Sequence, residues 1–163
     1  MNISKALQAD LIEILYLVKV CVQEKNDPCC CYWGLQHQLI KKDIAEGFVY
    51  IYRENEVCLG AITLNPLPLD EAKDSKWQDP SAKPLFIHRL LVHPNWRDKH
   101  IADSLIAFAE QYALGNGFTS LRLETFSEEA YLKDFMTRQS FRNLGDMTCH
   151  PQQPSYSYYV KGI

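Results

Sequence analysis

An apolar segment that leads through a short polar turn into an amphipathic helix constrains this fold more than any other feature of the sequence. Leu85–Val92 reads as a buried strand, and the turn that follows it contains Arg97 and Lys99. The first N–H groups of a helix have no partner within the helix, so they point at whatever lies in the preceding turn. We therefore expect an anion site at this turn, and a phosphate-bearing cofactor is its natural ligand.

Length and composition narrow the class of protein. The 163 residues fit a single domain over 1–163 that can bury its own core. A net charge of −3 argues against a general nucleic-acid binder, since such domains are usually basic on one face. No apolar run approaches the roughly 20 residues needed to cross a bilayer, and the N-terminus shows no signal-peptide pattern. We expect a cytoplasmic protein with no nucleic-acid or membrane partner.

The cysteines are expected to be free thiols, as is usual in the cytosol. Cys29, Cys30 and Cys31 are consecutive, which is not the spacing of a zinc site. Small, half-buried residues in a loop are favoured over metal ligands, so we predict no metal. Cys58 lies within a strand pattern and is expected in the core.

Periodicity in the first half of the chain predicts a short strand, two helices and a hairpin. Asp10 is expected to cap the first helix, and Gly47 to end the second. In the second helix, Leu35, Leu39 and Ile40 are predicted to face inward. The predicted elements are Ile3–Ala6, a helix from Leu11 through Val22, a helix over about Leu35–Ala45, and the hairpin strands Phe48–Arg53 and Val57–Leu64.

The second half begins with a segment of no sustained period. Asn65–Pro84 holds four prolines and is predicted to be a long loop, either beside a functional site or a passive surface excursion. Helices and strands resume beyond it. After the strand Leu85–Val92 the predicted elements are a helix over Ile101–Leu114, a strand over Leu121–Thr125, a helix over Glu128–Arg138, and the strands Arg142–Cys149 and Tyr156–Lys161.

This order of elements resembles the GCN5-related N-acetyltransferases, the GNAT family. Members carry a turn of the form Q/R-x-x-G-x-G/A after the fourth strand, and the matching run here is Arg97–Ala102. Arg89–Pro94 is similar to the strand end before that turn, Leu121–Thr125 to the fifth strand, and Phe135–Phe141 to a segment ending in Tyr-x-x-x-Gly-Phe or Tyr-x-x-x-Gly-Tyr. The resemblance implies an α/β (α+β) fold. Its mixed, mostly antiparallel sheet has about six to seven strands, about four flanking helices and splayed central strands.

The resemblance also implies a function. It suggests an acetyl-CoA-dependent N-acetyltransferase in which a primary amine of a small molecule or protein attacks directly within a ternary complex. The main-chain N–H near Leu91 or Val92 would polarise the thioester carbonyl. By the same resemblance, two groups of residues would bind coenzyme A. The pyrophosphate would lie on Arg97, Asp98, Lys99, His100, Ile101 and Ala102. The thioester arm would lie along Leu90, Leu91 and Val92.

Two residues are candidates for the base that removes a proton from the amine. His88 lies on the face of its strand opposite Arg89, and a histidine lies at the corresponding distance in the serotonin-acetylating relatives. Its alternative role is that of a hydrogen-bonded strand histidine. Glu124, at the end of the fifth strand, is the second candidate, and its alternative is a solvated carboxylate. Tyr156 and Tyr158 should share one face, for substrate contact or for core or dimer packing.

Four positions depart from the family pattern. His100 and Ser140 stand where glycine is usual, Glu129 where asparagine is common, and Met136 where many relatives have a tyrosine that protonates the leaving thiolate. These departures keep open an alternative, a catalytically degenerate acyl-CoA-binding or interaction module of the same fold. A protein without affinity for coenzyme A is a third reading. Edge strands of this fold often pair between subunits, which makes a homodimer a candidate assembly.

Overall fold

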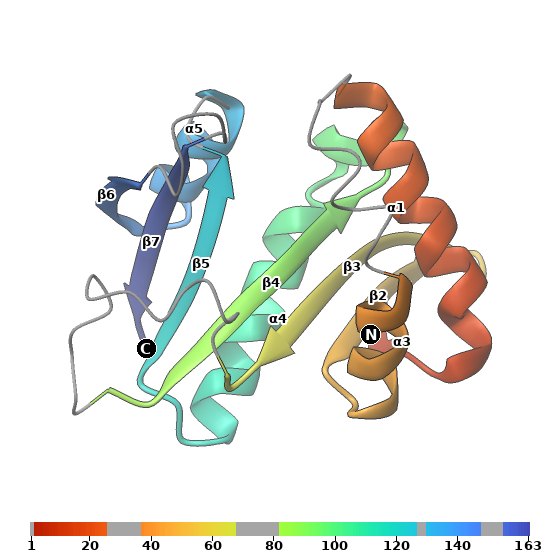
Figure 1. Ribbon diagram of the computed structural model, residues 1–163, viewed down its shortest axis with the longest axis horizontal. Helices are drawn as coiled ribbons and strands as arrows, with labels where there is room; N and C mark the ends of the chain where they lie inside the picture. The colour runs from red at the N-terminus through yellow and green to blue at the C-terminus, as the bar shows by residue number, and fades with distance from the viewer. Residues whose placement is uncertain (1, 26–36, 68–81, 127–129, 148–154) are drawn as a thin grey trace. The chain divides into compact units, whose positions relative to one another are not determined.

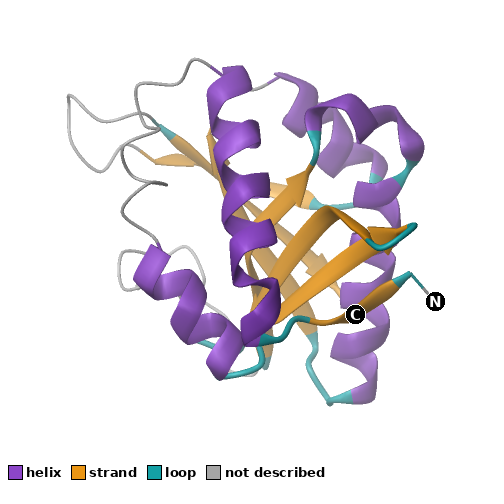
Figure 2. Cartoon of the chain, turned by 90° about the vertical axis from the view of Figure 1, so that its right-hand side faces the viewer, coloured by secondary structure: helices purple, strands orange, loops and turns teal. Residues whose placement is uncertain are grey.

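The computed structural model describes residues 2–25, 37–67, 82–126, 130–147 and 155–163 (Figure 1). Figure 2 shows its helices and strands, which follow one another in the predicted order. Within these ranges the helices are Leu11–Lys25 (α1), His37–Ala45 (α3), Ile101–Gly115 (α4) and Ala130–Arg138 (α5), with the short 3-10 helices Gln8–Asp10 (η1) and Pro94–Lys99 (η4). The strands are Ile3–Lys5 (β1), Val49–Glu54 (β2), Val57–Asn65 (β3), Pro84–Val92 (β4), Ser120–Phe126 (β5), Arg142–Met147 (β6) and Tyr156–Gly162 (β7).

The seven strands form one mixed sheet in the order β1-β2-β3-β4-β5-β7-β6. Strand β4 pairs with β5 in parallel, whereas β1 with β2, β2 with β3, β5 with β7 and β6 with β7 are antiparallel. This topology confirms the predicted fold class, a mixed and mostly antiparallel sheet flanked by helices.

The chain divides into two compact units. Unit 1 contains Met1–Leu64 and Arg89–Phe108, and unit 2 contains Asn65–His88 and Ala109–Ile163. Strand β4 and helix α4 contribute residues to both units. A single domain over 1–163 stays a prediction.

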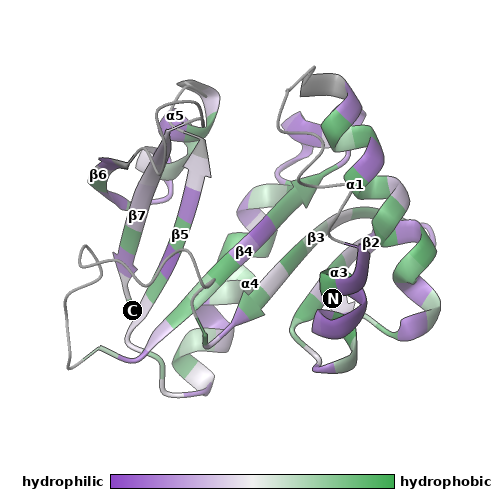
Figure 3. Ribbon diagram, viewed as in Figure 1, coloured by the Kyte–Doolittle hydropathy of each residue, from purple (hydrophilic) through white to green (hydrophobic). Residues whose placement is uncertain are grey.

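The core of unit 1 lies between α1, α3 and the hairpin β2–β3. Buried residues of α1 recur at helical spacing and meet those of α3 and the strands: Ile14, Leu17, Val18, Cys21, Ile40, Ile44, Val49, Ile51, Cys58, Ala61 and Leu91. Figure 3 shows β3 largely in the hydrophobic colour. Cys58 is buried as predicted. The prediction for Leu39 is wrong, because Leu39 is 47% exposed and Ile44 takes the inward position one turn beyond Ile40.

Local turn chemistry ends the elements of unit 1 where the sequence predicts. Gly47 adopts φ 78° after α3, where Gly47 N–H donates to Ile44 O and Phe48 N–H to Asp43 O. This is a Schellman motif, which favours glycine because the position is left-handed. In the hairpin, Asn55 and Glu56 both have positive φ, at 48° and 66°, as a two-residue turn of type I′ requires.

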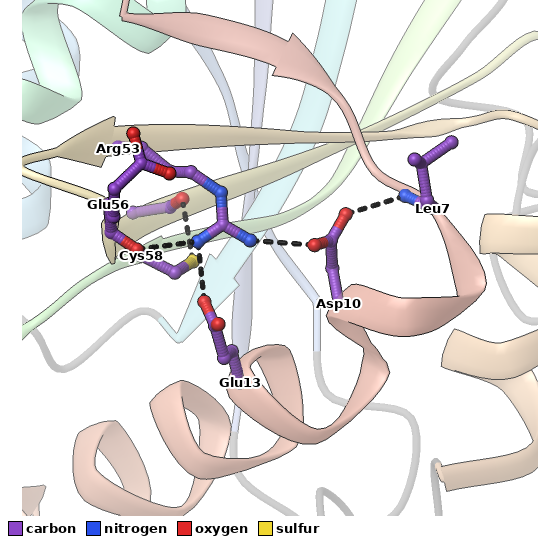
Figure 4. Close-up of polar contacts among 7 residues, drawn as sticks. Leu7, Asp10, Glu13, Arg53, Glu56 and Cys58 are labelled. Carbon is purple, nitrogen blue, oxygen red and sulfur yellow. Dashed lines mark hydrogen bonds and ion pairs between the residues drawn. The ribbon is translucent and has the colours of Figure 1, made fainter.

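A cluster of charged groups fixes the start of α1 against β2 (Figure 4). The Arg53 guanidinium donates to Asp10 Oδ1 at 2.7 Å, to Glu13 Oε2 at 2.5 Å and to the Glu56 carbonyl at 3.2 Å. Burial alone would lower the pKa of Arg53, but the bonds to Glu13 and Asp10 outweigh it and raise that pKa. Asp10 Oδ2 also accepts from Leu7 N–H, at 2.7 Å. Asp10 therefore caps η1, one turn earlier than the predicted cap of α1.

Unit 2 is built on β5, β7 and β6 with the first part of β4. The ladder between β4 and β5 joins Pro84–Ile87 to Ser120–Leu123, the first four residues of each strand. Lys161 of β7 donates to Glu110 of α4, and Ser157 donates to Asp146 of β6.

Some predictions fall outside the described residues. These are the roles of Cys29, Cys30, Cys31, Leu35 and Glu129, and most of the predicted loop Asn65–Pro84. Among the helices that are described, none combines the length and the apolar character needed to span a bilayer.

Candidate functional site

The polar turn predicted before α4 is the 3-10 helix η4 followed by one left-handed residue. His93 begins η4, where its Nδ1 accepts from Asn95 N–H at 3.3 Å, so this histidine has a capping role. His100 follows η4 with φ 56° and ψ 23°. Helix α4 then begins at Ile101, so a single left-handed residue separates the two helices.

The N-terminus of α4 presents backbone donors directly after this turn. The first i to i−4 bond of the helix runs from Ser104 N–H to His100 O, at 3.1 Å. The earlier N–H groups, those of Ile101, Ala102 and Asp103, consequently have no acceptor one turn before them within the helix. The helix dipole adds partial positive charge at the same end. This arrangement is suited to hold an anion by its backbone.

Side chains around the turn have mixed charge. Arg97 and Lys99 are basic residues in the last turn of η4. Asp98 is exposed, and Asp103 lies in the first turn of α4. The His100 side chain is 84% exposed, and its Nδ1 lies 3.3 Å from Asp103 Oδ2. The imidazole is thus held at the surface by its neighbour on α4.

Gly60 of β3 allows the first turn of α4 to pack closely on the strands of unit 1. A Cβ at Gly60 would lie 2.8 Å from Ile101 Cγ2, 3.1 Å from Leu105 Cδ1 and 3.2 Å from the Leu91 carbonyl oxygen. Only glycine fits this approach without movement of its neighbours. The sequence analysis missed Gly60, although a glycine inside a strand pattern is the signal that would have found it.

The predicted cofactor residues all lie in unit 1, and their side chains differ in exposure. Leu91 and Ile101 are buried, so only their backbone groups are candidates for contact with a ligand. Val92 O accepts a bond from the Cys21 thiol at 3.3 Å, and His93 N–H donates to Leu59 O at 2.8 Å. Leu90, Val92, Arg97 and Ala102 are half-buried, and Asp98, Lys99 and His100 are exposed.

Arg89 has a structural partner rather than a chemical role. Its Nη1 donates to Asp43 Oδ2 of α3 at 2.5 Å and lies 3.5 Å from Thr63 Oγ1. The Arg89 side chain is 6% exposed and the Asp43 side chain 13%. This buried ion pair joins β4 to α3 within unit 1.

His88, in unit 2, is half-buried and hydrogen-bonded. Its Nε2 lies 2.9 Å from the Leu67 carbonyl oxygen, and its ring stacks with that of Phe86 at 6.0 Å and 2°. A carbonyl oxygen only accepts, so Nε2 carries the hydrogen of this bond. The lone pair of the neutral imidazole is therefore on Nδ1.

The strand register of unit 2 places Glu124 on the same face as His88. Phe86 of β4 is paired with Arg122 of β5, and side chains two residues apart share a face. His88 and Glu124 are thus equivalent positions, each one residue beyond the last pair, Ile87 and Leu123.

Strand β7 adds tyrosines to the same face of unit 2. Glu124 is paired with Tyr158, and Phe126 with Tyr156, so the two tyrosines share one face as predicted. Tyr158 is buried, whereas Tyr156 is half-buried. In the parts of the chain that the structure describes, no group of His, Cys, Asp and Glu is arranged to hold a metal ion.

Comparison with models of protein families shows which family the chain belongs to. Residues 13–141 match the model of the acetyltransferase (GNAT) family, which is most of the sequence. The chain belongs to the GNAT family. No curated protein sequence matches this GNAT chain significantly.

Solved structures show that this GNAT protein has the family's fold. A GNAT acetyltransferase from Listeria monocytogenes is 18% identical with a TM-score of 0.79, covering 99% of this chain and 94% of the other. The PaiA N-acetyltransferase of Thermoplasma acidophilum, solved with coenzyme A, is 14% identical with a TM-score of 0.77, covering 99% and 98%. The ribosomal-protein-alanine N-acetyltransferase of Brucella melitensis is 17% identical with a TM-score of 0.73, covering 100% of both chains.

The two residues that the resemblance aligns with family glycines, His100 and Ser140, are both left-handed in this protein. His100 has φ 56° and Ser140 has φ 63°. Ser140 follows α5 in a Schellman motif, in which Ser140 N–H donates to Thr137 O and Phe141 N–H to Met136 O. Both backbones thus keep the conformation that favours glycine, at a cost of roughly 1–2 kcal/mol for each side chain.

Met136 is the residue that the resemblance aligns with the family's tyrosine. Met136 is buried in unit 2, and a thioether cannot protonate a leaving thiolate. Tyr131 lies on the same helix but is exposed, five residues earlier. At 100° per residue, the two positions point in different directions around α5.

Proposed function

We propose that this GNAT protein transfers an acetyl group from acetyl-CoA to a primary amine of a small molecule or a protein. The observation that carries the proposal is the N-terminus of α4. Its first N–H groups, at Ile101 and Ala102, follow strand β4 and the η4 turn, which is where the resemblance places the family's pyrophosphate site. The names of the Thermoplasma and Brucella neighbours, both N-acetyltransferases, support transfer to nitrogen.

The residues of the η4–α4 turn fit a pyrophosphate. The backbone supplies the hydrogen-bond donors, so a histidine in place of glycine at position 100 does not remove them. The exposed His100 imidazole lies next to the Asp103 carboxylate. Arg97 and Lys99 would each add about 0.3–1 kcal/mol of attraction at a solvated surface. Asp98 and Asp103 oppose this attraction in part.

When bound, acetyl-CoA would supply the activated acyl group as a thioester. The backbone of Leu90–Val92 would position the acyl carbonyl, with the N–H near Leu91 or Val92 as its hydrogen-bond donor. His88 is the first candidate to take the proton of the attacking amine, at Nδ1, and Glu124 is the second. The amine attacks directly, so no side chain of the protein is acylated.

The buried thiol of Cys58 is consistent with direct transfer. Burial raises the pKa of Cys58 to about 11, although Arg53 acts in the opposite direction. A thiol with this pKa is almost entirely protonated at neutral pH and is a poor nucleophile.

The proposal also includes a cytoplasmic location, a homodimer and the absence of nucleic-acid and membrane partners. The net charge of −3 supports the absence of a nucleic-acid partner. The pairing of edge strands between subunits in the family supports the homodimer.

One observation favours a second function, that of an acyl-CoA-binding or interaction module without turnover. Met136 is buried, and the resemblance aligns it with the tyrosine that acts as proton donor in many family members. Loss of a general acid commonly lowers a rate by about 10²–10⁴-fold. The leaving thiol has a pKa near 8.5, however, so it departs with less need of an acid than an alkoxide does.

Calorimetry and a thiol-release assay separate these functions. We expect saturable binding of coenzyme A that weakens in Arg97→Glu, and no such change in Lys19→Glu, which makes the same charge change on the exposed face of α1. We also expect release of free thiol with at least one member of an amine panel, and a large loss of that rate in His88→Gln. Binding without release would support the second function, and no binding would refute both.

A further inference from the structure

A hydrogen-bonded connection runs from the end of β3 to the imidazole of His88. Asn65, the last residue of β3, accepts the Leu67 N–H at its Oδ1, at 2.9 Å. The Leu67 carbonyl oxygen lies 2.9 Å from Nε2 of His88. All three residues belong to unit 2. One residue of backbone therefore links an asparagine side chain to the candidate base.

The geometry around Asn65 makes this backbone well defined. A bond from the Asn65 side chain to the N–H two residues later is an Asx turn, which shapes the backbone locally. Pro66 lies between the two residues and fixes its own φ near about −65°. Asn65 and Pro66 thus restrain the backbone that leads into Leu67, the residue whose carbonyl meets His88.

The bond to Leu67 favours one of the two neutral forms of His88. The carbonyl accepts only, so it selects the form in which Nε2 carries the hydrogen and Nδ1 the lone pair. In the other neutral form Nδ1 carries the hydrogen and cannot take a proton. Stacking on Phe86, at 2° between the ring planes, further restricts rotation of the imidazole.

We propose that Asn65 is a positioning residue that sets the tautomer of His88 through the Leu67 carbonyl. The kinetic consequence rests on the proposed function, in which His88 takes the proton of the amine at Nδ1. The structural consequence does not, because the tautomer is a property of the resting protein.

Nitrogen NMR of the full chain, labelled with ¹⁵N in histidine, tests the structural consequence. His88 is assigned by the loss of its signals in His88→Gln, and spectra are taken above the pKa of the ring. We expect a protonated Nε2 and an unprotonated Nδ1 in the wild type. In Asn65→Ala we expect the two ring shifts to move toward each other. The tautomer ratio should fall by at most about five-fold, which corresponds to the free energy of one net hydrogen bond.

Two further variants distinguish a specific effect of Asn65 on the His88 ring from a general disturbance of the fold. Asn65→Asp keeps an acceptor at the same atom and should retain the wild-type shifts. Asn116→Ala removes another asparagine bond to backbone, from Asn116 Nδ2 to Tyr112 O, and should leave the His88 shifts unchanged. A Nδ1-protonated ring in the wild type would overturn the proposal without any variant, and so would unchanged shifts in a folded Asn65→Ala.

Kinetics then test the link to catalysis. We expect Asn65→Ala to lower kcat by up to about five-fold with little change in KM, and Asn65→Asp to restore it. If the ring shifts behave as expected but His88→Gln leaves acetyl transfer intact, the base assignment fails and the positioning by Asn65 stands. If the ¹⁵N shifts of His88 do not change in Asn65→Ala, the positioning role of Asn65 is refuted, whatever the rate of acetyl transfer.

Discussion

The buried ion pair between Arg89 and Asp43 allows a quantitative test of the structure. Asp43→Asn keeps the size of the side chain but removes the carboxylate that lies 2.5 Å from the Arg89 guanidinium, a side chain only 6% exposed. Thr63 Oγ1, at 3.5 Å, is a neutral and distant acceptor. Breaking a buried pair by removal of one partner commonly costs about 3–5 kcal/mol. We expect about 3 kcal/mol here, because the amide oxygen of the new side chain would still accept a hydrogen bond.

Urea denaturation measures this loss, and a neighbouring pair supplies the control. Lys42 and Glu46 form an i,i+4 pair at the same helix at 3.8 Å, with side chains 67% and 42% exposed. Glu46→Gln should cost less than about 1 kcal/mol, since exposed pairs contribute little. For a chain of this size, a loss of about 3 kcal/mol corresponds to a fall in melting temperature of roughly 6–12 °C.

The double variant Arg89→Met with Asp43→Leu completes the test. Replacing both charges by apolar side chains removes the uncompensated charge, so stability should return to within about 1 kcal/mol of the wild type or exceed it. The reasoning is refuted if Asp43→Asn costs no more than Glu46→Gln, since the pair would then behave as if it were solvated.

Three further predictions concern packing, titration and backbone strain. Gly60→Ala places a methyl group 2.8 Å from Ile101 Cγ2, so it should destabilise the protein by about 1–3 kcal/mol and weaken coenzyme A binding in calorimetry. The pKa of Cys58 is raised to about 11, so its alkylation at pH 8, followed by peptide mass spectrometry, should be about 100-fold slower than in the unfolded chain. Because the folded state favours the protonated thiol, the stability contributed by Cys58 is present below pH 9 and is lost as the pH rises to about 11. Ser140→Gly should raise the stability by up to about 1 kcal/mol, since Ser140 has φ 63°; a loss of stability would contradict the strain argument.

Much of the fold was accessible from local sequence patterns. The period of apolar residues predicted α1 and α4, and the Glu54–Glu56 segment predicted the hairpin, because these signals lie within a few residues of one another. Gly47 marked the end of α3 for the same reason. The turn before α4 was also predictable as structure, since it depends on a strand end and a helix start that are contiguous in the chain; its binding of an anion stays a prediction.

Local patterns failed where the outcome depends on what packs against an element. Leu39 was expected to face inward but is exposed, because the other elements of unit 1 pack on the side of α3 that holds Ile40 and Ile44. Asp10 was expected to cap α1, yet its side chain bonds to Leu7 and Arg53 before the helix begins. Sequence spacing records the period of a helix but not the rotation that tertiary packing selects.

The sequence by itself determined the order of the elements, the family and the backbone donors that follow η4. Only the tertiary structure decided the partners: Arg89 with Asp43, 46 residues away, and His88 with Leu67, 21 residues away. The physical reason is the separation along the chain over which each interaction acts. Turn chemistry and periodicity act between neighbours in the chain, whereas the tautomer of His88 and the burial of Arg89 are set by groups that only the folded chain brings within hydrogen-bonding distance.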